Sequence, residues 1–129
     1  MNTKRRIIAA IMIVSVVVSV FAMQSVAVTS ISYSTGTHKK IGSYYNSASS
    51  TRYFHINNTY SSGNSDVWLS VENSSGTTVY GRKQFPRFVT TSDLVVSCPK
   101  YTTRYFWVKP ATSGYTVSGS YDYSVMTTA

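Results

Sequence analysis

The chain has 129 residues, 12 Lys and Arg against four Asp and Glu, and a formal net charge of +8. So short a chain has room for one hydrophobic core but not for two, and its single cysteine excludes an internal disulfide bond. Its stability must therefore come from the packing of secondary structure.

Residues 1–27 are predicted to be a secretory signal peptide. A positively charged start precedes the apolar run at 7–22, and small residues offer cleavage after Ala22 or Ala27. An uncleaved anchor is the alternative, since the run extended to Val28 nearly spans a bilayer. Polar residues interrupt that run, so we expect cleavage, release to the outside of the cell, and no stable membrane insertion afterwards.

The remaining chain is rich in Ser, Thr, Tyr and Val and poor in Leu and Ala, a composition that favours strands. Residues 28–50 form a Ser- and Tyr-rich segment that is expected to be an N-terminal arm or an edge strand near 41–45. Residues 51–129 are expected to form a β-sandwich. An exported chain with so few cysteines also suggests a bacterial source.

Alternating apolar residues predict six to eight short strands and no helix after the leader. The first is 53–56, which is expected to lead into a polar loop at 57–65. Residues 66–72 and 77–84 are then expected to pair as a hairpin around the turn at 73–76. Turn signals at near-regular spacing are typical of an antiparallel β-sandwich, here of jelly-roll-like type.

The C-terminal part continues this pattern. Strands are expected at 93–98 and 103–109, each ended by a proline, and at 120–126. Residues 104–125 are interpreted as a C-terminal hairpin. Cys98 follows an apolar run, so it is expected to be a buried small hydrophobe in preference to a reactive thiol.

Two stretches carry a resemblance to a known family. The segments "SDVWLSVENSSGTTVY" (65–80) and "TTRYFWVKPATSGYTVSGSYDYSV" (102–125) resemble the bacterial pre-peptidase C-terminal domain, over roughly Arg52 to Met126. The resemblance implies a secreted, non-catalytic β-sandwich concerned with targeting and with binding to surfaces or polymers. This chain departs from the family in being basic, and it lacks the acidic run of a calcium-binding variant.

Catalytic residues are hard to assemble from this sequence. Asp66 and Glu72 would lie about 20 Å apart on one strand, too far for a glycosidase pair. Asp66 and Asp93 are expected to bind the local backbone. Neither His38 nor His55 belongs to a nucleophile motif or to a set with metal-ligand spacing. We therefore expect no enzyme activity, no cofactor and no metal site.

Aromatic and basic side chains are the candidates for binding. Trp68 should face away from the apolar side of its strand, where it could stack on a sugar ring. Tyr105 and Trp107 share one side of a strand that is either central and buried or an aromatic platform. With Leu so scarce, some of the 11 tyrosines must build the core. The predicted ligand-binding residues are Trp68, Tyr105, Trp107, Arg82, Lys83 and Arg87.

These features predict a secreted, non-catalytic module that binds an extracellular surface or polymer. The expected partner is an extracellular glycan or an anionic cell-surface polymer, and bacterial envelope glycan is the preferred candidate. Nucleic acid is not expected. Two alternatives stay open: a secreted cationic antimicrobial effector, and an inhibitor or accessory of a separate secreted peptidase, for which the partner would be a secreted protein.

Overall fold

The computed structural model describes residues 27–86 and 93–129, and only the backbone of residues 59–61. The predicted signal helix and Arg87 lie outside these ranges. None of the described residues belongs to a helix long and apolar enough to cross a membrane. The regular elements of the described ranges are eight strands: β1 (Val28–Thr35), β2 (Lys39–Tyr45), β3 (Arg52–Gly63), β4 (Val67–Glu72), β5 (Val79–Phe85), β6 (Leu94–Cys98), β7 (Thr103–Pro110) and β8 (Val117–Met126).

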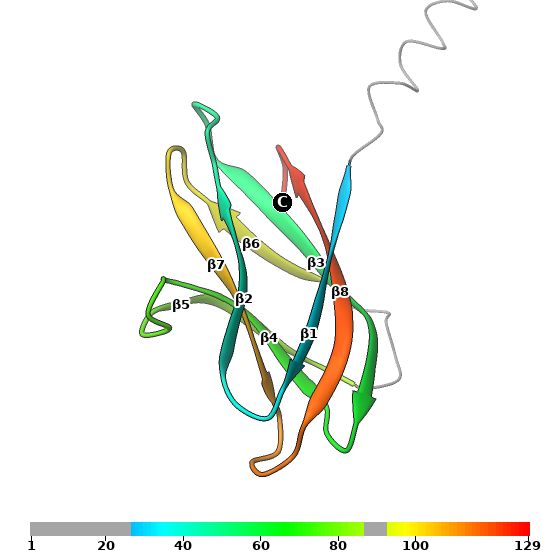
Figure 1. The fold of residues 1–129 in the computed structure, drawn as a ribbon. Coiled ribbons are helices and arrows are strands. Elements are labelled where there is room, and N and C mark those ends of the chain that lie inside the picture. Colours follow the sequence, from blue (N-terminus) through cyan, green and yellow to red (C-terminus); the bar gives the residue numbers. More distant parts are fainter. Residues whose placement is uncertain (1–26, 87–92) are drawn as a thin grey trace, which may run out of the picture.

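The strands form two antiparallel four-stranded sheets that pack face to face (Figure 1). The first sheet has the order β1-β8-β3-β6, and the second has the order β2-β7-β4-β5. Successive strands mostly alternate between the sheets, and early strands lie beside late ones. This is the arrangement of an eight-stranded jelly roll, so the predicted all-β, jelly-roll-like sandwich is confirmed.

Residues 28–50 contribute an edge strand to each sheet. β1 pairs with β8 in the first sheet, and β2 pairs with β7 in the second. The turn between them carries the chain from one sheet to the other (Figure 1). This turn brings His38 to the outside of the second sheet.

The predicted polar loop at 57–65 is wrong, because β3 continues to Gly63. It pairs with β8 as far as Gly63 opposite Val117, with one irregularity between Asn58 and Tyr60. Polar side chains are tolerated there because one face of this sheet is solvated. The inward Asn58 is satisfied by a hydrogen bond from the Tyr33 hydroxyl, with 2.8 Å between the oxygens.

The predicted C-terminal hairpin is also wrong. β7 belongs to the second sheet and β8 to the first, and the connection at 111–116 crosses between them (Figure 1). Pro110 ends the ladder of β7, and packed sheets lie about 10 Å apart, a distance that six residues span easily. The other expected hairpin, β4 with β5, is confirmed.

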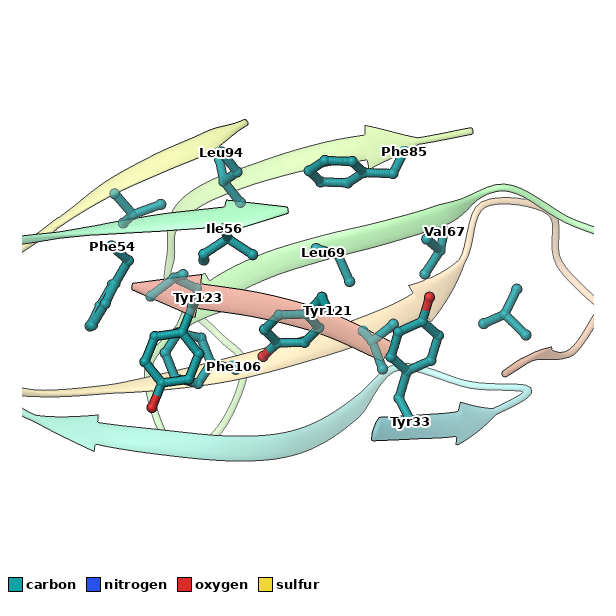
Figure 2. Packing of buried hydrophobic residues seen from close by; sticks show 14 of the residues in the cluster. Tyr33, Phe54, Ile56, Val67, Leu69, Phe85, Leu94, Phe106, Tyr121 and Tyr123 are labelled. Atoms are coloured by element: carbon teal, nitrogen blue, oxygen red, sulfur yellow. The ribbon is translucent and has the colours of Figure 1, made fainter. Parts of the chain in front are cut away.

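The core between the sheets combines Phe and Tyr rings with branched aliphatic side chains (Figure 2). Phe106 lies 4.7 Å from Tyr123 and 6.0 Å from Tyr121 between ring centroids, and Phe54 lies 5.2 Å from Phe106 in an edge-to-face arrangement. Tyr33, Tyr121 and Tyr123 are all buried, which confirms that tyrosines take the place of the missing leucines.

Two small residues complete the core. Cys98 is fully buried, as predicted, and burial raises the pKa of its thiol. Gly81 allows the sheets to approach each other, since a Cβ there would lie 2.6 Å from a methyl group of Val96. The two sheets therefore come close together where β5 faces β6.

A basic and aromatic face on the second sheet

The two outer faces differ in chemistry. The outer face of the first sheet is rich in serine, with Ser34 bonded to Ser118 and Ser30 donating to the carboxylate of Asp122. The outer face of the second sheet carries indole, phenol, ammonium and guanidinium groups. The register of its strands places them in three rows, each written from β7 through β4 to β5: Lys109–Trp68–Gln84, Trp107–Ser70–Arg82 and Tyr105–Glu72–Val79.

The orientation of these rows follows from the period of two along a strand. Val67, Leu69 and Val71 of β4 are buried, so Trp68 and its alternate neighbours point outward. Lys40 of β2 lies opposite Trp107 and extends the middle row. The predicted inward and outward sides of β4 are therefore confirmed. We call the outward side chains of these rows, together with Lys40, the basic face.

Trp107 is held in place by several neighbouring residues. The ring of His38 stacks on the indole with 4.4 Å between centroids. The indole Nε1 donates a hydrogen bond of 3.1 Å to the carbonyl of Asn73. Gly76 has a positive φ of 72°, and a Cβ there would come within 3.1 Å of both rings. Trp107 is thus a half-buried support for the surrounding loops.

Glu72 is a buried acid in the midst of these cations. Its side chain is only 3% exposed, and its Oε2 lies 2.7 Å from Nε2 of His38. The hydroxyl of Ser70 donates a second hydrogen bond to the same oxygen. Because the serine bonds the carboxylate and not the imidazole, the three residues lack the serine–histidine contact of a nucleophilic site. What they do is fix the turn at 36–38 against β4.

The β4–β5 turn directly follows Glu72 and is held by several hydrogen bonds. The side-chain oxygen of Asn73 accepts hydrogen bonds from the backbone N–H groups of Thr77 and Thr78, at 2.9 and 3.2 Å. Lys40 donates to the carbonyl of Ser74 at 3.1 Å and lies 4.9 Å from the ring centroid of Tyr105. The turn is therefore anchored to β2 and β7 as well as to its own strands.

Trp68 is half-buried like Trp107, but it borders a hollow. The guanidinium of Arg82 lies 5.2 Å from its ring centroid, and Lys109 is its partner on β7. A hollow of about 200 Å³ adjoins the indole; its walls include Glu72, Arg82 and Lys109. A second hollow, of about 360 Å³, lies between residues 36–38 and 109–113. His38 and Lys109 line both, so the two hollows are neighbours.

The predicted site residues divide into three groups. Trp68, Tyr105, Trp107 and Arg82 share the basic face. Lys83 does not join them, because it pairs with the inward Leu69, and its ammonium donates to the carbonyl of Asp93 at 3.1 Å. Arg87 lies outside the described residues.

Sequence reasoning did not count Lys40, Glu72 and Lys109 among the binding residues, and it did not place His38 beside this face. Alternation along the strands did predict that Glu72 lies on the side of Trp68, and Lys109 on the side of Trp107. The contact of His38 with Glu72 joins residues 34 positions apart and depends on the strand order. No local pattern could have indicated it.

The second histidine belongs to the first sheet. His55 lies 3.0 Å from the carboxylate of Asp93 through Nδ1 and 3.1 Å from the carbonyl of Thr128 through Nε2. The hydrogen bond to Thr128 raises the pKa of His55 above 6.5, with a further contribution from Asp93 that burial partly offsets. Asp93 thus binds a side chain where a bond to the local backbone was predicted. The carboxylate of Asp66 accepts a hydrogen bond from the side-chain amide of Gln84, at 3.3 Å.

Within residues 27–86 and 93–129, no three His, Cys, Asp or Glu side chains come together as a metal site. Comparisons with protein-family models, curated proteins and solved structures found no match. The geometry of the basic face is therefore the basis for assigning a function.

Proposed function

We propose that this protein is a secreted, non-catalytic module that binds an anionic polymer outside the cell, with bacterial envelope glycan as its partner, and that the basic face is the binding surface. The observation that supports this most is the position of Arg82 and Lys109 beside the outward Trp68, with Lys40 beside Trp107 on the same face and the one acid of the rows buried and hydrogen-bonded.

The charge balance of the face favours a polyanion. Glu72 is enclosed by His38 and Ser70, so it presents little negative charge to a ligand. Asp66 precedes β4 at the end of the face, where it is engaged by Gln84. The three long cations face outward in a small area, and such a cluster attracts extended anions.

Sedimentation with isolated bacterial envelopes tests this proposal. The mature protein is expected to sediment with the envelopes, and the Trp68→Ala variant to remain largely in the supernatant. Tyr45→Ala removes an exposed ring that lies opposite Thr103 at the far end of β2 and β7, and it serves as the matched control. Equal sedimentation of a folded Trp68→Ala variant and of wild type would reject the role of the basic face.

A leakage assay separates this proposal from the cationic effector. Dye-filled vesicles of anionic phospholipid are expected to stay intact, because binding through a rigid sheet face needs no insertion into the lipid. Leakage at the concentrations that saturate envelopes would instead support an effector that acts on competitor cells.

A further inference from the structure

We propose, as an extension of the proposed function, that the two adjoining hollows are consecutive subsites for a chain of acidic pyranose residues, with Trp68 stacked on a sugar ring and Arg82 and Lys109 binding its carboxylate. The hollows measure about 200 and 360 Å³. Together they fall within the range of about 300–1,000 Å³ that is usual for small-ligand sites.

The indole of Trp68 favours a ligand that has a ring, because it borders the smaller hollow. Of the two tryptophans, Trp107 is covered by His38 and bonded to Asn73, whereas Trp68 lines a hollow. The flat apolar side of a pyranose can lie on an indole, and that contact buries apolar surface of both. An acyclic polyol phosphate has no such side, so it would gain little from Trp68.

The donors beside Trp68 are free to bind a carboxylate. Within the described residues, neither Arg82 nor Lys109 donates a hydrogen bond to a protein group, although Arg82 contacts the Trp68 ring. A guanidinium presents paired N–H groups that match the two oxygens of a carboxylate. These two cations lie on the strands that flank Trp68, so a charged sugar on the indole would lie between them.

The shared wall of the hollows indicates an extended ligand. Lys109 and His38 line both, and the second hollow continues along the turn at 36–38 and the connection at 110–113. A single sugar would fill only the hollow at Trp68. A chain would place the next sugar beyond Lys109, which could then bind the carboxylate of either residue.

Titration calorimetry with three matched ligands tests this assignment. Oligogalacturonate has rings and charge, its methyl ester has the same rings without charge, and a ribitol phosphate oligomer has charge without rings. We expect oligogalacturonate to bind at least tenfold more tightly than either of the others. Equal affinity for the acid and its ester, or for the acid and ribitol phosphate, would overturn the inference.

Two variants locate the subsite. Lys109→Met is expected to weaken oligogalacturonate about tenfold and the ester less than twofold. Lys100→Met removes the same charge from the β6–β7 turn and is expected to change neither. Equal losses in both variants would show attraction to net charge alone and overturn the inference. Trp68→Ala is also expected to weaken oligogalacturonate about tenfold; if this variant does not fold, Arg82→Met is used in its place, with the same loss expected.

The outcomes also separate this inference from the proposed function. Envelope sedimentation that needs Trp68, together with no preference for oligogalacturonate, would reject the acidic sugar and leave the polymer-binding role in place. If envelope sedimentation does not need Trp68 and oligogalacturonate is not preferred, both this inference and the proposed function are rejected.

Discussion

Replacing Tyr121 by Phe should stabilise the protein, although it removes a polar group from a natural core. Tyr121 is 1% exposed, and its hydroxyl has no hydrogen-bond partner within the described residues. The pKa of this phenol is raised far above its usual value of 10.0, and burial is the largest cause of the shift. The group is therefore neutral at any ordinary pH. A buried polar group without a partner costs about 1–3 kcal/mol.

The substitution leaves the packing unchanged, because the ring 6.0 Å from Phe106 stays in place (Figure 2). We therefore expect a gain of about 1 kcal/mol, which raises the melting temperature of a domain of this size by about 4–8 °C. Circular dichroism on heating gives the melting temperature, and urea unfolding at 25 °C gives the free energy.

Tyr33→Phe is the matched control with the opposite sign. The hydroxyl of Tyr33 donates to the buried side chain of Asn58 at 2.8 Å, so its removal leaves that acceptor without this bond. A loss of about 1–3 kcal/mol is expected. A Tyr121→Phe variant that loses stability, as Tyr33→Phe should, would refute the reasoning, since it would mean that the Tyr121 hydroxyl is well solvated or bonded in the folded protein.

Three further predictions concern the faces and the close approach of the sheets. Glu72→Ala should cost about 1–3 kcal/mol, because His38 and Ser70 lose their shared acceptor; urea unfolding measures it. Gly81→Ala should destabilise by about 1–3 kcal/mol, since its methyl group would overlap Val96, and a melting temperature equal to that of wild type would contradict the close approach. Because the pKa of His55 is raised in the folded protein, its contribution to the free energy of unfolding is full below about pH 6.5 and is lost as the pH rises through the folded-state value. His55→Gln should therefore lower the free energy of unfolding in urea more at pH 5.5 than at pH 8.5. Equal losses at the two pH values would contradict this.

Alternation along single strands could be predicted from the sequence. The inward Val67, Leu69 and Val71 identified both the core side of β4 and the outward Trp68, because side chains on a strand alternate in direction. The same rule would have separated Arg82 from Lys83, which are adjacent and therefore point to opposite sides of β5.

Features that depend on strand order could not be predicted in this way. The polar end of β3 is a strand only because β8 pairs with it throughout, and an isolated polar run resembles a loop. The contact of His38 with Glu72 requires β2, β7 and β4 to be neighbours in one sheet. Such tertiary pairing carries no local sequence signal, which is why the position of His38 beside Glu72 was not predicted.

Binding of envelopes by two double variants tests the central claim most directly. Arg82→Met with Lys109→Met removes two charges from the basic face, while Arg52→Met with Lys100→Met removes the same charge from β3 and the β6–β7 turn. At physiological salt we predict that the first pair loses most of its sedimentation with envelopes and that the second retains it. Equal retention, or equal loss, in the two folded variants would contradict the assignment of binding to the basic face.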